Sequence, residues 1–539
     1  LTPHMRNIIK GINERHGVPG MALAFVRADG PTEFGNWGVR SEVGDAMSSD
    51  TLFTIASSSK AFLTSGLGLL MDDFAQGQNT TPLPEGLLRF DWDTKVKDLL
   101  PDEWVLMDRW ATEMATIHDI LSHVSGIPAH DLAYSRGDSS KDIVARLKYL
   151  RPAFELRERF SYTNLMYMVG KHIIDKYGPG SFFEFIDTRI FKPLNMSSTY
   201  SPAVASASGR ATENWTNEGR RIPWWYTEDD YELLSGPGGV IASAEDLAKW
   251  VRMLLHAGVD PSTNTTILPE SVFSETTLAR VIVGARGTGP ASISGYAMGW
   301  SRYSVSGHEI IAHSGGISGI TTFVILSPRD GFGIVILANA DWKQPAIAEV
   351  VDTITRHAWG LSHDQPSLLP VSPASHNRKP FSGEKQMHAP PETDLTGAYA
   401  GDGFGVVVLC NVSSTSQRCQ DVLNTFFAVD RASSEPIPAN VTQLYAAWPL
   451  YWTTHVRMIH LHGMRFILRP TALFPEGYGR DKTPFETFEG EFGEYAEAEF
   501  VVHEGRVQGF GLFVLKELGR EKERGDSVET RASVWFARV

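Results

Sequence analysis

The hydrophobic pattern of the first 360 residues mixes helix-like and strand-like segments. Apolar residues run from Ala61 to Met71 behind a serine-rich stretch, and a second helical pattern spans Leu165 to Lys176. Two apolar segments, 319–326 and 332–339, are joined by Ser-Pro-Arg-Asp-Gly, which is typical of a β-hairpin turn. A further helical stretch covers 346–359. This part of the chain therefore combines helices with at least one strand pair.

The pattern changes after that helix. Residues 366–392 are rich in Pro, Ser, Lys and His and lack an apolar period, which is typical of a linker. Beyond them, short alternating runs predict strands at Gly397–Tyr399, Gly405–Leu409, Val456–His460, Phe466–Leu468, Ala498–Val502, Val507–Phe513 and Ser533–Ala537. Such runs separated by turns predict an all-β barrel. We therefore expect one domain at 1–365, a linker at 366–392 and a β-barrel at 393–539.

The composition and net charge of the chain argue against some classes of binding partner. The chain has 539 residues, 42% of them hydrophobic, and a formal net charge of −14. The negative charge disfavours nucleic acid and anionic membranes as partners, and no apolar run approaches the length of a membrane span. The sequence begins with Leu1, which is consistent with a removed signal peptide or a shortened chain.

The first candidate for chemistry is Ser57-Ser58-Ser59-Lys60, at the start of the Ala61 helix. Residues three apart share a helix face, so Ser57 and Lys60 can point into the same cleft. A serine hydroxyl is a poor nucleophile until a nearby group favours loss of its proton, and Lys60 can supply that field. A second Ser-x-x-Lys, at Ser382, lies in a polar stretch with no apolar helix behind it.

Two further motifs follow in order. Tyr162-Thr163-Asn164 is the only Tyr-x-Asn in the chain, and His313-Ser314-Gly315-Gly316 lies on a predicted strand. Together with Ser57 and Lys60 they resemble the serine β-lactamase and penicillin-binding-protein superfamily, on the side of the class C β-lactamases and D-Ala-D-Ala carboxypeptidases. The resemblance covers about the first 360 residues and includes the segments 116–127, 191–196 and 236–243.

The resemblance implies a fold and a set of roles. The fold is of the α/β (α+β) class, an antiparallel sheet with flanking helices and an all-α lobe. Ser57 would form the acyl-enzyme, Lys60 would be its electrostatic partner and proton relay, and Tyr162 would be the general base, which requires a depressed pKa. Asn164 would orient Lys60 and bind a substrate carbonyl, and the N–H groups of Ser57 and Gly316 would form the oxyanion hole. Gly397 to Gly405 resembles the opening of the lipocalin-like barrel that some members carry.

The strand motif departs from the β-lactamase pattern. Such enzymes carry Lys-Thr-Gly or Lys-Ser-Gly there, whereas this chain has His313-Ser314-Gly315, and histidine is largely neutral near pH 7. Within the superfamily this resembles esterases, amidases, lactonases and D-aminopeptidases. We therefore expect hydrolysis of small-molecule esters, lactones or amides through an acyl-enzyme. The alternatives are acyl transfer, D-aminopeptidase or weak β-lactamase activity, and a penicillin-binding-like module that acylates without turnover.

An aromatic segment and four histidines are the remaining candidates for substrate or metal binding. Trp224, Trp225 and Tyr226 are interpreted either as a cleft wall against the substrate or as packing between lobes. His308 and His313 are spaced unlike a zinc-binding helix motif, so we expect neither a metal nor a cofactor. His118 and His123 are interpreted as structural. The chain has no Gly-x-Ser-x-Gly elbow, which argues against an α/β-hydrolase.

Two further features favour secretion. Cys410 and Cys419 are the only cysteines and flank an eight-residue polar loop, which favours a disulfide across a hairpin end, with two free thiols as the alternative. Asn-x-Ser/Thr sequons begin at Asn79, Asn195, Asn214, Asn264, Asn411 and Asn440. We expect a secreted glycoprotein, with a cytoplasmic protein as the alternative.

Overall fold

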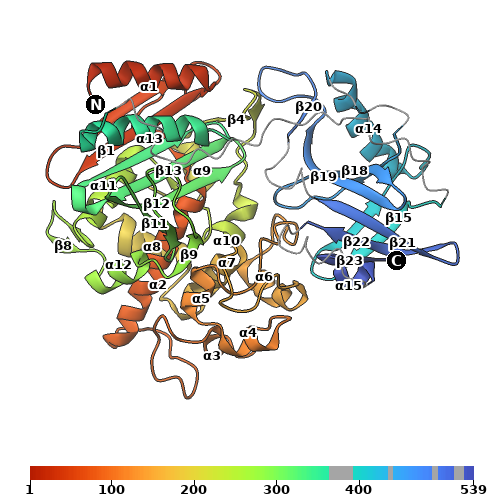
Figure 1. Cartoon of the computed structure of the whole chain (residues 1–539), viewed down its shortest axis with the longest axis horizontal. Helices are drawn as coiled ribbons and strands as arrows, with labels where there is room; N and C mark the ends of the chain where they lie inside the picture. The colour runs from red at the N-terminus through yellow and green to blue at the C-terminus, as the bar shows by residue number, and fades with distance from the viewer. Residues whose placement is uncertain (363–392, 435–436, 438–440, 488–495, 515–526) are drawn as a thin grey trace.

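The computed structural model describes residues 1–362, 393–434, 437, 441–487, 496–514 and 527–539. Figure 1 shows a larger N-terminal unit of helices and strands beside a smaller C-terminal unit built mostly of strands. The expected linker, 366–392, lies outside the described residues. Among those described, no helix has the length and apolar character needed to cross a bilayer.

An eight-stranded antiparallel sheet organises the N-terminal unit. Its strand order is β2-β1-β14-β13-β12-β11-β10-β9. The predicted hairpin is confirmed as β13 and β14, with Gly331 in the left-handed region at φ 67° in its turn. The strands are β1 (Gly20–Arg27), β2 (Glu33–Gly38), β9 (Val281–Gly284), β10 (Ser294–Tyr296), β11 (Ser301–Val305), β12 (His308–Ile317), β13 (Ile320–Ser327) and β14 (Phe332–Ala338).

The sheet separates two hydrophobic cores because neighbouring side chains on a strand point to opposite faces. Leu23 and Phe25 of β1 pack in one core with helices α1 (Pro3–Arg15) and α13 (Gln344–Trp359). Ala22 and Ala24 face the other core, shared with α11 (Ala244–Leu255) and the helical lobe. Figure 1 shows α1 and α13 together on the sheet's outer side. The β12 motif is thereby placed at the boundary between sheet and lobe.

The helical lobe is built around α2 (Lys60–Ala75), which is buried along most of its length, and α7 (Leu165–Tyr177). A Cβ at Gly170 would lie 2.9 Å from Leu63 Cδ2, so the two helices pack in close contact. Their N-termini carry Lys60 and Asn164. The other helices of this unit are α3 (Val96–Leu99), α4 (Arg109–Met114), α5 (Ile117–Leu121), α6 (Ser140–Arg146), α8 (Phe182–Ile186), α9 (Pro202–Ala207), α10 (Tyr231–Leu234) and α12 (Glu270–Thr277). Short ladders pair β3 (Phe53–Thr54) with β6 (Ile241–Ala242), β4 (Asn214–Trp215) with β5 (Arg221–Ile222) and β7 (Val259–Asp260) with β8 (Thr265–Thr266).

The C-terminal unit is an antiparallel, barrel-like sheet. Its order is β16-β15-β23-β22-β21-β19-β18-β17, with β20 paired to β19. Cys410 and Tyr445 exchange backbone hydrogen bonds of 2.8 Å, which bring the two ends of this order together. All seven predicted strands are present, and β17 and β20 were missed. The elements are β15 (Gly397–Gly401), β16 (Gly405–Leu409), α14 (Gln417–Ala432), β17 (Gln443–Ala447), β18 (His455–His462), β19 (Arg465–Phe474), β20 (Phe485–Thr487), β21 (Glu497–His503), β22 (Arg506–Phe513), α15 (Val528–Arg531) and β23 (Val534–Arg538).

Cys410 and Cys419 form a disulfide, as predicted, but its setting differs from the prediction. Cys410 follows β16, whereas Cys419 lies in the first turn of α14. The bond therefore joins a strand to a helix and does not close a hairpin. Among the predicted glycosylation sites, Asn214 is buried and its Nδ2 donates to Ser318 O at 3.2 Å, so the folded chain cannot present it to a glycan.

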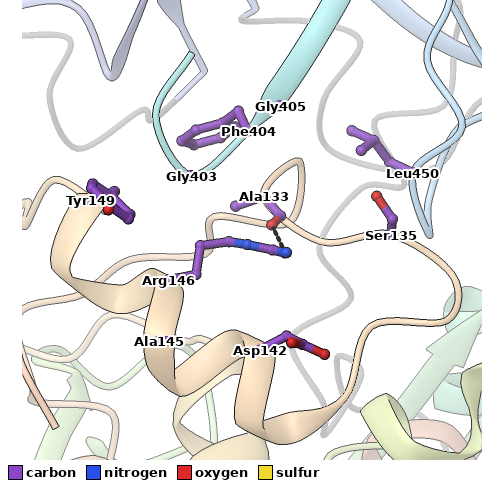
Figure 2. Close-up of a pocket in the computed structure, with 10 residues that line it drawn as sticks. All are labelled: Ala133, Ser135, Asp142, Ala145, Arg146, Tyr149, Gly403, Phe404, Gly405 and Leu450. Carbon is purple, nitrogen blue, oxygen red and sulfur yellow. Dashed lines mark hydrogen bonds between the residues drawn. The ribbon is translucent and has the colours of Figure 1, made fainter. Parts of the chain in front are cut away.

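The two units contact each other at several places. Arg151 Nη1 donates to Thr530 O and Ala532 O at 2.8 Å each, and Arg220 Nη2 donates to Thr483 O at 2.7 Å. A pocket between α6 and the barrel is lined from both sides (Figure 2), with Ala133, Ser135 and Arg146 below and Phe404 and Leu450 above. The segment around Ala133 is therefore in contact with the barrel.

Candidate active site

The backbone that presents Ser57 is held in an unusual conformation. Ala56, immediately before it, has a φ of 47°, in the left-handed region that costs a non-glycine residue about 1 kcal/mol or more. Thr322 Oγ1 on β13 donates to Ile55 O at 2.9 Å, and Val240 N donates to Ser59 Oγ at 3.1 Å. These contacts fix the turn from both sides. Ser57 lies in the short helical turn Ala56–Ser59 that leads into α2.

Gly315 allows β12 to lie directly against this turn. A Cβ at position 315 would lie 2.3 Å from Ile55 O and 2.3 Å from Thr322 Oγ1, closer than any packed carbon. The strand motif and the nucleophile turn are therefore in backbone contact. Glycine is required here because of close approach and not because of φ.

Gly315→Ala should consequently displace β12 from the Ser57 turn. We expect a loss of about 1–3 kcal/mol in the free energy of unfolding, as for other overpacked sites, together with a fall in activity. Gly316→Ala is the matched control, because the atom nearest its Cβ, Gln344 Nε2, is 3.9 Å away. Chemical denaturation measures the first effect, and equal stability of the two variants would contradict the steric argument.

Lys60 is fully buried and has three acceptors around its amine. Nζ lies 3.2 Å from Ser57 Oγ, 2.8 Å from Asn164 Oδ1 and 3.0 Å from Pro237 O. Burial lowers the pKa of Lys60 to about 7, although the negative charge of Asp131 acts in the opposite direction. The neutral form of the amine is thus accessible near physiological pH, and in that form it can accept a proton from Ser57.

Tyr162 is the second side chain that contacts Ser57 Oγ. Its hydroxyl donates to Ser57 Oγ at 2.8 Å, and its ring lies 4.8 Å from Lys60 Nζ. Burial raises the pKa of Tyr162 above its usual range, and the hydrogen bond with Ser57 only partly offsets this. The depressed pKa that a role as general base requires of Tyr162 is therefore not found in the resting site. Desolvation dominates, and Tyr162 is a neutral hydroxyl donor in the resting site.

His313 belongs to a buried group of rings beneath Tyr162. Its Nδ1 lies 2.6 Å from Ser314 O, so Nδ1 carries the hydrogen and Nε2 accepts from Tyr296 OH at 3.1 Å. Burial lowers the pKa of His313 to about 3, with Lys60 acting in the same direction. The ring is neutral at physiological pH. It cannot provide the permanent cation that a lysine would place on this strand.

His123 belongs to the same group of rings, and its structural role stays a prediction. Its ring centroid lies 4.5 Å from that of Tyr162, and its Nδ1 accepts from Thr163 N at 3.2 Å. This hydrogen bond fixes the backbone between Tyr162 and Asn164. His118 lies elsewhere, with Nδ1 3.3 Å from Asp93 Oδ1.

Residues 5–349 of the chain match the family model described as Beta-lactamase. The chain belongs to the beta-lactamase family. It is a serine hydrolase of that family, and the motif-based resemblance is confirmed at this level.

Relatives of this family member include an unguisins hydrolase of Aspergillus campestris, 29% identical over 73% of the chain and 74% of the relative. Among solved structures, an octameric penicillin-binding protein homologue from Pyrococcus abyssi aligns over 95% of the chain and 98% of its own, with a TM-score of 0.56 and 18% identity. The D-amino acid amidase from Ochrobactrum anthropi SV3 aligns over 66% of the chain and 98% of its own, with a TM-score of 0.51 and 21% identity. These two structural similarities concern the fold.

The aromatic segment Trp224–Tyr226 packs against the main core. Trp225 and Tyr226 are buried in the main core, and Tyr226 OH lies against Gly239. Packing therefore accounts for the burial of both residues, and their contact with substrate stays a prediction. Trp224 keeps partial exposure, so its contact with substrate stays a prediction.

Sequence reasoning missed the residues that surround Lys60 from outside the motifs. Pro237 lies in the segment 236–243, which supported the resemblance. Its carbonyl accepts from Lys60 because of how the backbone folds, and a sequence pattern does not show this. Asp131 lies in the loop before α6, and Asn164 Nδ2 approaches its Oδ1 at 3.5 Å. A lone aspartate in an aperiodic loop gives no signal in a single sequence. The barrel residue that contacts this loop, Trp452, was missed for the same reason.

Proposed function

We propose that this protein hydrolyses small-molecule amides and esters through an acyl-enzyme on Ser57. The observation that carries the proposal is the position of Ser57 Oγ between the buried amine of Lys60 and the hydroxyl of Tyr162. A serine with a proton acceptor on one side and a proton donor on the other is arranged for acyl transfer. The relative named as an unguisins hydrolase supports a hydrolytic outcome.

In acylation, the neutral amine of Lys60 takes the Ser57 proton while Oγ bonds to the substrate carbonyl carbon. The proton then passes to the leaving nitrogen or oxygen as its bond to that carbon breaks, with the Tyr162 hydroxyl as the relay. Deacylation repeats the sequence with water in place of the serine hydroxyl. The N–H groups of Ser57 and Gly316 are the proposed donors to the carbonyl oxygen. This exchanges the roles that sequence reasoning gave to Lys60 and Tyr162.

The rate should depend on pH through Lys60. Because only its neutral amine accepts the proton, kcat/KM should fall about tenfold per unit as pH drops below the pKa near 7, and should level off above it. His313 should contribute no break in this range, since it stays neutral down to about pH 3. A profile that is flat from pH 5 to 8 would contradict the assignment of Lys60 as base.

Tyr162→Phe should slow turnover by about 10²–10⁴-fold, the usual cost of a lost acid or base group. The ring keeps its packing against His123, so the loss isolates the hydroxyl. Tyr177→Phe is the matched control, because Tyr177 OH donates to Leu99 O in the lobe and does not contact Ser57. Equal rates for the two variants would remove Tyr162 from the mechanism.

The substrate class is best tested by measuring the cleavage of several substrates with one enzyme preparation. The panel contains D- and L-amino-acid amides, p-nitrophenyl esters of increasing length and a chromogenic cephalosporin, each with Ser57→Ala as background. The neutral His313 ring favours substrates without a carboxylate at this strand. We expect amides and esters to be cleaved and the cephalosporin to be turned over feebly. Fast cleavage of the cephalosporin alone would overturn the proposal.

A further inference from the structure

A loop of the barrel reaches the residues that surround Lys60. It comprises residues Trp448–Thr454, between β17 and β18, and we call it the barrel loop. Tyr451 N donates to Tyr134 O at 3.1 Å, and Trp452 Nε1 donates to Tyr134 OH at 2.6 Å. Tyr134 is fully buried in the loop before α6. The barrel therefore contributes a hydrogen bond to a side chain inside the catalytic unit.

The hydrogen bond from Trp452 Nε1 determines how the Tyr134 hydroxyl uses its own hydrogen. A tyrosine hydroxyl has one hydrogen, and as it accepts from Trp452 it donates its own hydrogen to Asp131 Oδ1 at 2.5 Å. Asp131 is a carboxylate and accepts. The chain of bonds from the barrel thus ends on a negative charge near the site.

The side-chain amide of Asn164 lies between the Asp131 carboxylate and Lys60 and contacts both. Its Nδ2 points to Asp131 Oδ1 at 3.5 Å, and its Oδ1 accepts from Lys60 Nζ at 2.8 Å. The carboxylate fixes which end of the amide faces Lys60, because only the nitrogen can donate to it. A reversed amide would place N–H groups against the lysine amine.

Among the titratable groups near Lys60, Asp131 is the one whose charge raises the pKa of the lysine. His123 and His313 lose positive charge by burial, and Tyr162 and Tyr167 are held neutral by burial. Asp131 is the carboxylate that opposes the effect of burial on the pKa of Lys60. Its negative charge raises the proton affinity of the amine.

We propose that Asp131 is a positioning residue for Lys60, acting through Asn164, and that Trp452 of the barrel loop holds Asp131 in place through Tyr134. The barrel is then part of the catalytic apparatus. This inference rests on the proposed function, since it concerns the same serine and lysine.

Asp131→Asn in the full-length protein tests the charge. Asparagine has nearly the same shape and keeps an oxygen for Tyr134, so the variant removes mainly the charge. The acid limb of kcat/KM should move to lower pH by about half a unit to one unit, because Lys60 loses a stabilising negative neighbour. An acid limb at the wild-type pH overturns the inference, whereas a wild-type enzyme without turnover would instead refute the proposed function.

A double-mutant cycle tests the connection to the barrel. Trp452→Phe should lower kcat about three- to tenfold with little change in KM, and should have no further effect in a Tyr134→Phe background, where its acceptor is gone. Trp448→Phe is the matched control, because this buried tryptophan of the same loop has an Nε1 without a hydrogen-bond partner in the described part of the chain. Additive effects, or equal effects of the two tryptophan variants, would overturn the link to the barrel.

Discussion

Ser57→Ala should abolish hydrolysis of every amide and ester that the wild-type protein cleaves. In the described part of the chain, the Ser57 hydroxyl is the nucleophile within hydrogen-bond distance of both Lys60 Nζ and Tyr162 OH, and alanine removes it without changing the turn. Removal of a catalytic serine costs about 10⁶ in kcat in a well-studied serine protease, so activity should reach background. Initial rates of hydrolysis of a p-nitrophenyl ester and an amino-acid amide measure this loss of activity.

Ser382→Ala is the matched control for this variant. Ser382 begins the second Ser-x-x-Lys of the chain, outside the described residues, and has no predicted role. Its activity should equal that of the wild type. Residual activity of a few per cent in Ser57→Ala, or a comparable loss in Ser382→Ala, would contradict the assignment of the nucleophile.

Lys60→Met should lower kcat/KM by about 10²–10⁴-fold at pH 8, because the serine loses its proton acceptor. Methionine has a similar length and suits the buried position. The remaining activity should no longer rise across pH 6 to 8, since the titrating amine is gone. Pre-steady-state acylation by a p-nitrophenyl ester measures the affected step directly.

Lys60→Arg separates two roles that a lysine can have. Arginine keeps the positive charge but does not release its proton, so it can supply a field but cannot act as a base. We expect Lys60→Arg to be about as slow as Lys60→Met. A largely active arginine variant would show that Lys60 acts through its charge, and the base would then have to be sought elsewhere.

The sequence predicted those parts of the site that depend on local spacing. Ser57 and Lys60 are adjacent because they lie three residues apart at a helix start. The resemblance to the β-lactamase superfamily implied that Tyr162 and Asn164 would join them. The pKa of Tyr162 could not be predicted, since its burial arises from His123, distant in sequence, and the rings around it. The roles assigned to these residues stay predictions until the variants are measured.

In the C-terminal unit, the alternation of apolar and polar residues predicted strands, but it did not predict the helix α14 between them. The stretch that forms α14 has buried residues at Cys419, Val422, Leu423, Phe426 and Val429, which is a helical spacing. The hairpin expected around the disulfide would place this stretch in a strand, and the helix was missed. Secretion, glycosylation and the lipocalin-like character of the barrel stay predictions.

The measurement that tests the central claim most directly is rapid-quench mass spectrometry during turnover of a p-nitrophenyl ester. Acid quench within the burst should give a protein heavier by one acyl group, and peptide mapping should place that group on Ser57. The adduct should decay at the rate of turnover and should be absent from Ser57→Ala. Turnover without an adduct, or an adduct on any other residue, would contradict the acyl-enzyme mechanism.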